Sequence, residues 1–168
     1  MANILAVYGT SHGHTAKVVG RIVHGLIAHG HHLTVRRGNE LAGLSLDTYD
    51  AFLVAGSVIY GKHQPYLRHF VRENAGRLNA CPSAFVSVCG ALIGTWPRGP
   101  AEAEKYVAGF LKATGWQPRQ KLSVAGALPY TKYGPINRLV MRLISRHTGR
   151  PTDTSRDWVR IPGRFLSS

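Results

Sequence analysis

The segment from Gly9 to Thr15 contains the residue types that bind phosphate in proteins. It reads G-T-S-H-G-H-T, with a short apolar run before it and a helical pattern after it. A turn that leads from a strand into a helix presents free backbone N–H groups and the positive end of the helix to an anion. Thr10, Ser11 and Thr15 add three hydroxyl donors, and the loop contains no Lys or Arg. The sequence therefore predicts a phosphate site built from dipoles and hydroxyl groups.

Two better-known phosphate motifs do not match this loop. The Walker A motif needs four residues between its glycines and then Lys, whereas three residues separate Gly9 from Gly13 and His14 follows. The dinucleotide fingerprint G-x-G-x-x-G is absent after this strand. The remaining alternative is an ordinary helix cap rich in Ser and Thr.

Hydrophobic periodicity predicts the elements that hold the loop in place. Short apolar runs, typical of buried strands, alternate along the chain with residues that recur at three- and four-residue intervals, typical of helices. The expected strands are residues 3–8, 32–37, 51–55, 83–88 and 122–128. The expected helices are residues 14–29 with Gly30 as the stop, a helix opened by Pro65 and closed by Gly76, residues 101–114 with Gly115 as the stop, and residues 135–148.

This alternation predicts an α/β fold, a three-layer sandwich in which helices cover both faces of a parallel sheet. Five strands in 168 residues favour the strand order 2-1-3-4-5. Such a sheet binds its ligand beyond the carboxyl ends of the strands, between the first and the third. We expect one domain over residues 1–168, with residues 135–148 as an inserted helix, because the sequence shows no internal repeat and no low-complexity linker.

The charge of the chain is strongly positive and unevenly distributed. Lys and Arg total 21 and Asp and Glu total 8, for a net charge of +13. Residues 1–95 carry 8 bases and 4 acids, whereas residues 96–168 carry 13 bases and 4 acids. The asymmetry favours an anionic partner for the second half, and a generally basic proteome is the alternative.

The predicted helix over residues 135–148 concentrates part of this charge. Arg138, Arg142 and Arg146 repeat at four-residue intervals and form one stripe, with aliphatic residues on the other face. A basic amphipathic helix binds an anionic membrane surface, its Arg stems lying along apolar surface. The alternative is a helix that covers the sheet and turns a solvated Arg face outward. Nucleic acid is not an expected partner, because the bases are not interleaved with aromatic residues.

His29, His31 and His32 are the densest group of metal-ligand types in the chain. Zinc sites normally use four ligands, and no Cys or carboxylate cluster accompanies these histidines. We therefore expect no metal site.

The phosphate loop and several later segments resemble one protein family. Residues 10–15 resemble the flavodoxin phosphate loop, whose pattern is Ser/Thr-x-x-Gly-x-Thr, and residues 56–61 resemble the flavin-ring loop of that superfamily. Segments similar to one branch follow in order at residues 68, 77–79, 82–85, 125–130, 138–141, 143–144 and 152–154. That branch is the flavodoxin-like, menaquinone-dependent protoporphyrinogen IX dehydrogenases.

The resemblance implies a flavodoxin fold that binds FMN noncovalently. It assigns the ribityl phosphate to Thr10, Ser11, His12, Gly13, His14 and Thr15. It places the isoalloxazine against Ser57, Val58, Ile59, Tyr60 and Gly61, and against a second wall of Val88, Cys89, Gly90 and Ala91. Tyr60 is the candidate for stacking on the ring, the alternative being a Tyr packed under the loop. His12 and His14, when protonated, would help to hold the phosphate at lower pH.

The same resemblance implies an FMN-dependent oxidoreductase of heme biosynthesis. The donor would be protoporphyrinogen IX, oxidised to protoporphyrin IX, and the acceptor menaquinone or another quinone. No catalytic residue is identified; His63 is a weak candidate for a proton relay, and a solvated loop His is its alternative. Lys132, Arg138, Arg142 and Arg146 would pair with substrate carboxylates or lipid phosphates.

Two other functions remain open at this point. One is a flavodoxin-type electron carrier or general quinone reductase, although such carriers are generally acidic. The other is a non-catalytic membrane-associated binding module. The final helix of the family should lie near residues 156–168, where Pro162-Gly163 interrupts the pattern. We expect a short or irregular terminal layer there, or a partner subunit of a homo-oligomer in its place.

The sequence shows no apolar run long enough for a membrane span and no signal peptide near Met1. We therefore expect a cytoplasmic protein, peripheral on the inner face of the cell membrane.

Overall fold

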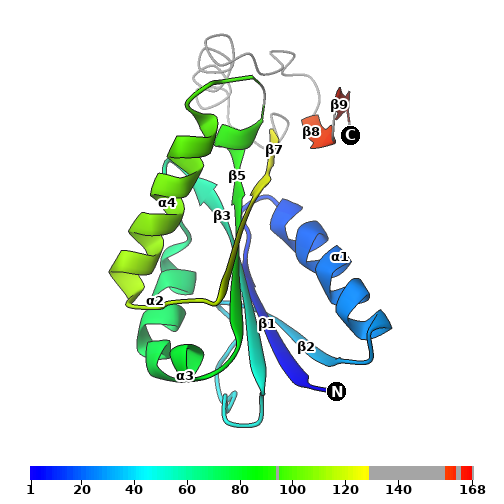
Figure 1. The fold of residues 1–168 in the computed structure, drawn as a ribbon, viewed down its shortest axis with the longest axis vertical. Coiled ribbons are helices and arrows are strands. Elements are labelled where there is room, and N and C mark those ends of the chain that lie inside the picture. The colour runs from blue at the N-terminus through cyan, green and yellow to red at the C-terminus, as the bar shows by residue number, and fades with distance from the viewer. Residues whose placement is uncertain (94, 129–157, 162–163, 168) are drawn as a thin grey trace.

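A parallel sheet with helices on both faces forms the body of the molecule (Figure 1). The computed structural model describes residues 1–93, 95–128, 158–161 and 164–167. The strands are β1 Asn3–Gly9, β2 His32–Arg37, β3 Ala51–Ile59, β4 Lys62–His63, β5 Ser83–Cys89, β6 Gln120–Ala125, β7 Ala127–Leu128, β8 Trp158–Ile161 and β9 Arg164–Ser167. The helices are α1 His14–Ala28, α2 Pro65–Glu73, α3 Ala75–Ala80 and α4 Gly99–Thr114, with a 3₁₀ turn at Gly90–Leu92.

The order of the parallel strands is β2-β1-β3-β5-β6. This is the predicted order 2-1-3-4-5, because β4 is a two-residue strand that pairs only with β3. Gly9 pairs with Gly56, and Gly56 pairs with Ser87. The carboxyl ends of β1, β3 and β5 therefore meet at one edge, where the order of the strands reverses.

Side chains of the central strands alternate between two apolar cores. Leu5, Val7 and Phe85 pack with α2, α3 and α4 on one face. Ala6 and Val86 pack with α1 on the other. β1 is buried on both faces, which explains its continuous apolar run.

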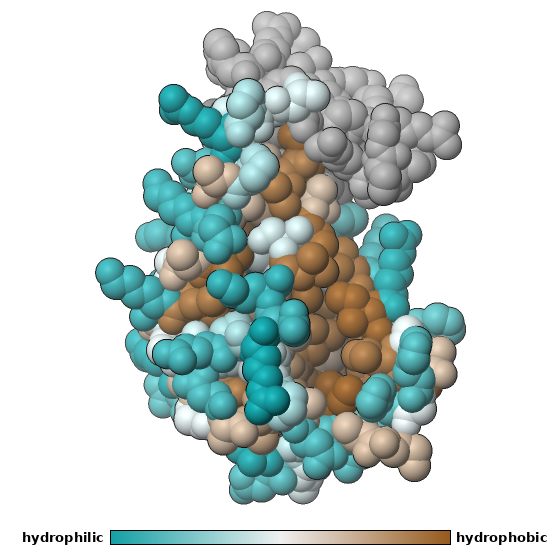
Figure 2. Space-filling model, viewed as in Figure 1, coloured by the Kyte–Doolittle hydropathy of each residue, from teal (hydrophilic) through white to brown (hydrophobic). Residues whose placement is uncertain are grey.

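The α1 face of the sheet extends beyond the part that α1 covers. Leu122 of the edge strand β6 is 53% exposed, and Val124 of the same strand is only partly buried. Figure 2 shows apolar residues gathered along the centre of the view, between α4 and α1. Among the described elements, α1 alone packs on this face, which leaves part of the sheet's apolar surface accessible.

The helix predicted from Pro65 to Gly76 is two helices in the structure. Gly76 does not close the helix that begins at Pro65; α2 ends at Glu73 and Gly76 lies inside α3. Asn74 separates the two helices, and its Nδ2 donates to the Phe70 carbonyl at 2.8 Å. The chain turns back into a helix because Leu78 is fully buried in the core.

The fifth predicted strand, residues 122–128, is also wrong as one element. It is divided at Gly126 into β6, which joins the parallel sheet, and β7, which pairs with β8. The Gly126 N–H donates to the Cys89 carbonyl at 3.0 Å, so the chain bends toward the end of β5.

The described C-terminal residues form two short strands in the region, near residues 156–168, where the final helix of the family would lie. β8 and β9 pair antiparallel, and Pro162-Gly163 falls between them in the sequence. Pro and Gly disfavour a helix, and both strands are rich in aromatic and aliphatic residues. The predicted basic helix, residues 135–148, lies outside the described residues. None of the described helices has the length and apolarity that a membrane crossing requires.

Candidate functional site

The loop between β1 and α1 leaves the first backbone amides of α1 without a capping side chain. Gly13 is the N-cap residue, with a left-handed φ of 80°, and α1 has no acidic residue in its first turn. The Thr10 hydroxyl accepts a hydrogen bond of 2.8 Å from the Gly13 N–H, which closes the loop on itself. The positive end of the helix therefore faces outward over a rigid turn, as an anion site requires.

Thr15 provides the strongest indication that this loop binds something. The residue is fully buried, and its Oγ1 has no hydrogen-bond partner among the residues that the structure describes. Burying an unpaired hydroxyl costs about 1–3 kcal/mol. A phosphate oxygen at the start of α1 would satisfy this group, so the loop fits the phosphate of FMN.

The histidines of the loop contribute less charge than the sequence indicates. Burial, and then the positive charges of Lys17 and Arg21, lower the pKa of His14 below its usual value. His14 is therefore neutral over a wider pH range than an ordinary His. The predicted contribution of protonated His14 to phosphate binding is restricted to more acidic conditions.

The predicted flavin-ring loop is a rigid β-hairpin. β3 continues beyond the sheet, where Val58 pairs with His63 and Ile59 with Lys62 of β4. Tyr60 and Gly61 form the two-residue turn with φ of 49° and 78°. Positive φ at both positions is characteristic of a type I′ turn. Tyr60 is 72% exposed at the tip, so the alternative of a Tyr packed under the loop is wrong.

Gln64 connects this hairpin to the phosphate loop, and the sequence analysis missed it. Its Nε2 donates to the Ser11 hydroxyl at 3.1 Å and to the Ser57 hydroxyl at 2.5 Å. A Cβ at Gly9 would lie 2.7 Å from the Gln64 Oε1. Gly9 and Gly56, which pair at the ends of β1 and β3, leave room for the Gln64 side chain. These two glycines are the signal in the sequence that could have indicated it.

His63 is a core residue, not the solvated loop His that was the alternative to a relay. It is 6% exposed, its Nε2 lies 2.9 Å from the Ser87 Oγ, and its ring packs edge-on against Phe110 at 4.9 Å. Burial lowers its pKa to about 4. The ring is therefore uncharged at neutral pH and anchors the hairpin to the core.

The segment after β5 presents backbone more than side chains. Val88 and Cys89 are buried, and the Ala91 N–H donates to the Cys89 Sγ at 3.3 Å. Gly90 is partly exposed, and a Cβ added there would meet no atom within 4 Å. A second wall for a flavin would consist mainly of the Gly90 and Ala91 backbone.

One cavity of about 420 Å³ lies between the phosphate loop and the hairpin. Its lining includes Ser11 of the phosphate loop, Tyr60 of the hairpin, and Gln64 between them. The segment from Val88 to Ala91 does not line this cavity, although strand pairing places Val88 beside Ser57 at the end of β3. Lys132, Arg138, Arg142 and Arg146 lie outside the described residues. Within residues 1–93 and 95–128, no three His, Cys, Asp or Glu side chains group as metal ligands.

Comparison with known proteins identifies the family. A family model of the flavodoxin domain matches residues 5–155. The chain belongs to the flavodoxin family. This membership confirms the predicted resemblance, and it agrees with the strand order and with the position of the phosphate loop.

Two curated relatives of this flavodoxin-family chain carry the same name. A protoporphyrinogen IX dehydrogenase (quinone) from Escherichia coli (strain K12) is 29% identical over 163 residues, which cover 94% of this chain and 89% of that protein. A protoporphyrinogen IX dehydrogenase (quinone) from Leishmania major is 28% identical over 172 residues, which cover 97% of this chain and 72% of that protein.

Solved structures agree on the flavodoxin fold. A flavodoxin from the domain Archaea superposes with a TM-score of 0.51 at 18% identity, covering 73% of this chain and 84% of that one. The apo form of an NADH:FMN oxidoreductase superposes with a TM-score of 0.54 at 15% identity, covering 74% and 75%. At these identities the likeness establishes the arrangement of sheet and helices alone.

Proposed function

We propose that this flavodoxin-family protein is an FMN-dependent oxidoreductase of heme biosynthesis. It oxidises protoporphyrinogen IX to protoporphyrin IX and uses menaquinone or another quinone as electron acceptor. The observation that supports FMN as the cofactor is the buried, unpartnered Thr15 hydroxyl near the uncapped amides of α1. The names of the two relatives support the substrates.

The proposed cofactor site uses the residues predicted from the resemblance. Thr10, Ser11, His12, Gly13, His14 and Thr15 bind the phosphate, and Ser57, Val58, Ile59, Tyr60 and Gly61 border the ring. The second wall is Val88, Cys89, Gly90 and Ala91, acting through the backbone of its last two residues. When bound, FMN would supply the hydride-accepting chemistry that couples oxidation of the donor to reduction of a quinone.

The residues around the cavity are proposed to bind the flavin and to orient it. The turn and the buried His63 hold the hairpin backbone that carries Tyr60 at the rim of the cavity. Gln64 ties the hairpin to the phosphate loop, so both ends of the flavin site are positioned by one side chain. Preorganisation of this kind reduces the entropy lost when a ligand binds.

We also propose where this protein lies in the cell and how it assembles. Residues 1–168 form one domain that lies in the cytoplasm, peripheral on the inner face of the membrane. Lys132, Arg138, Arg142 and Arg146 bind the anionic surface, where each basic residue contributes roughly 1 kcal/mol. A homo-oligomer would cover apolar sheet surface near β6. The net charge of +13 supports the membrane surface as a partner.

The purified protein tests this proposal directly. We expect a flavin absorbance spectrum after reconstitution with FMN, and anaerobic formation of protoporphyrin from protoporphyrinogen with a menaquinone analogue. Bound FMN without porphyrin formation would refute the substrate and retain the cofactor. A long-lived one-electron form with no porphyrin oxidation would instead support the electron carrier.

A further inference from the structure

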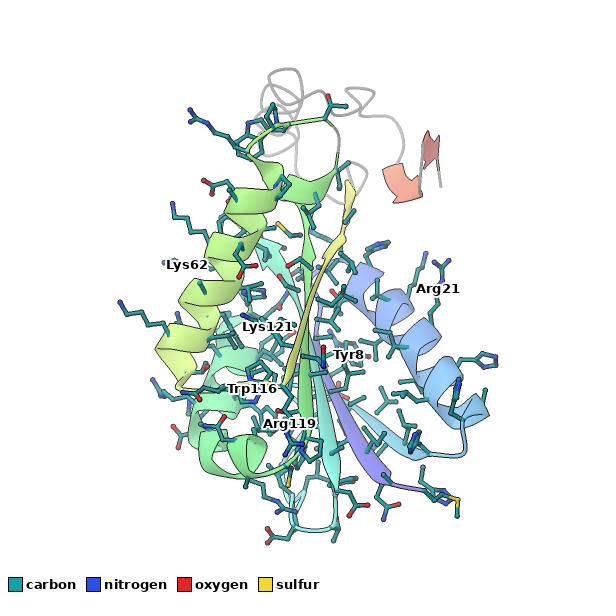
Figure 3. The ribbon with its side chains drawn as sticks, viewed as in Figure 1. Tyr8, Arg21, Lys62, Trp116, Arg119 and Lys121 are labelled. Carbon is teal, nitrogen blue, oxygen red and sulfur yellow. The ribbon has the colours of Figure 1, made fainter. Side chains whose placement is uncertain are left out.

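A second cavity beside the hairpin is lined by positively charged residues from three separate elements. Its volume is about 360 Å³, and it lies between β4, α2 and α4. Lys62 comes from β4, Arg68 from α2 and Lys105 from α4. Figure 3 shows Lys62 on the α4 side of the sheet, whereas Arg21 lies on α1 across the sheet.

These three cations have no acidic partner within the protein as described. The ion pairs between described residues involve other bases, namely Arg37, His69, Arg72 and Arg77. No side-chain hydrogen bond in the described ranges uses Lys62, Arg68 or Lys105 either. Like charges around one cavity repel each other, so an anionic ligand there would be stabilised.

The rest of the lining is suited to an apolar or aromatic group. Tyr106 and Phe110 form the wall on α4, and Gly109 and Ala113 leave the space open. His63 lines the same cavity and is uncharged at neutral pH, since burial lowers its pKa to about 4. The cavity therefore fits an apolar body that carries anionic groups.

This cavity shares Lys62, His63 and Arg68 with the 420 Å³ cavity that reaches Ser11 and Tyr60. Two of the three cations, Lys62 and Arg68, therefore border both this cavity and the proposed flavin site. A quinone ring carries no charge and gains nothing from three cations. The electron donor, in contrast, is an apolar macrocycle with two carboxylate arms.

We propose that Lys62, Arg68 and Lys105 form a subsite that binds the carboxylate arms of the tetrapyrrole substrate. The proposal rests on the proposed function and adds to it a binding site for the donor. Charge-assisted hydrogen bonds from Arg and Lys to the carboxylates hold the donor. Its ring is then oriented along the hairpin toward Tyr60.

Equilibrium binding of protoporphyrin IX to the FMN-loaded protein tests the subsite. We expect K105Q and R68Q each to raise the Kd for protoporphyrin IX about tenfold, the loss of one charge-assisted hydrogen bond. The Kd for FMN should not change in K105Q, because Lys105 lines this cavity and not the 420 Å³ cavity of the proposed flavin site. K112Q on α4 and R72Q on α2 are matched controls, and both should bind the porphyrin like the unaltered protein.

A change in the ligand gives an independent readout. Protoporphyrin IX dimethyl ester lacks the free carboxylates, so its Kd should be the same in K105Q and in the unaltered protein, and insensitive to salt. Unchanged Kd values for the free acid in K105Q and R68Q, with porphyrinogen oxidation intact, would overturn the subsite and leave the proposed function standing. Failure of the unaltered holoprotein to oxidise porphyrinogen would overturn both.

Discussion

Thr15 makes the phosphate loop testable at the level of one hydroxyl group. Thr15→Val keeps the shape of the side chain and removes the buried, unpartnered Oγ1. We expect the Kd for FMN to rise about tenfold, because a hydrogen bond to a charged phosphate is lost. The free energy of unfolding of the FMN-free protein should stay the same or increase. Flavin fluorescence titration and urea unfolding measure the two quantities.

Thr15→Ser is the matched control for this prediction. It retains the hydroxyl and should bind FMN nearly as the unaltered protein does. Tight FMN binding by Thr15→Val would show that the hydroxyl plays no part in holding the phosphate.

The buried His63 should make the free energy of unfolding depend on pH. Its pKa is about 4 in the folded protein, against an ordinary value of 6.5. Between these values the unfolded chain binds more protons, so the free energy of unfolding rises with pH. The stabilisation is complete above about pH 6.5 and is lost as the pH falls toward 4, by ~3 kcal/mol. Urea unfolding across this window measures it.

His63→Gln should flatten this part of the pH profile, because the side chain no longer titrates. His24→Gln, at an exposed position on α1, should leave the profile unchanged. An identical slope in His63→Gln and the unaltered protein would assign the pH dependence to another group.

At the scale of elements, the close approach of α2 to the sheet depends on glycine. A Cβ at Gly56 would lie 2.7 Å from the Leu67 Cδ2 and 3.1 Å from the His63 Cδ2. Leu67 is fully buried and has little room to move. We expect Gly56→Ala to lower the free energy of unfolding by about 1–3 kcal/mol through overpacking. Denaturant unfolding of the FMN-free protein measures the loss.

Gly20→Ala serves as the comparison for this substitution. Nothing lies within 4 Å of a Cβ at Gly20, which is inside α1. The helix should gain roughly 0.5–1 kcal/mol from the replacement. Equal stability of the Gly56 and Gly20 variants would contradict the close packing at the end of β3.

At the scale of the whole molecule, the net charge of +13 predicts binding to anionic surfaces. We expect the protein to bind vesicles that contain phosphatidylglycerol at low salt, and to be released as the salt concentration rises. Pure phosphatidylcholine vesicles should bind it weakly. Co-sedimentation with vesicles measures both.

The triple variant R138Q/R142Q/R146Q tests the contribution of the predicted basic helix. At roughly 1 kcal/mol per residue, it should weaken partitioning about a hundredfold. The triple variant R21Q/R36Q/R72Q removes the same charge elsewhere and serves as the control. Equal weakening in both variants would assign the binding to net charge and not to this helix.

The main architecture was predictable because its signals are local. The apolar run of β1 and the three- and four-residue spacing in α1 each lie within one element, and the phosphate loop lies between these two elements. Gly115 was predictable as the stop of α4 for the same reason, since its left-handed φ of 69° suits glycine. The sequence alone therefore determined the sheet order, the loop and the family.

Other features required the tertiary structure because they join residues far apart in the chain. The bridge from Gln64 to Ser11 spans 53 positions, and the contact of His63 with Ser87 spans 24. Lys62, Arg68 and Lys105 share a cavity only after α4 packs beside the hairpin. Burial and neighbouring charge depend on the packed fold, so no local pattern in the sequence indicates which histidine is neutral or which cations face one ligand.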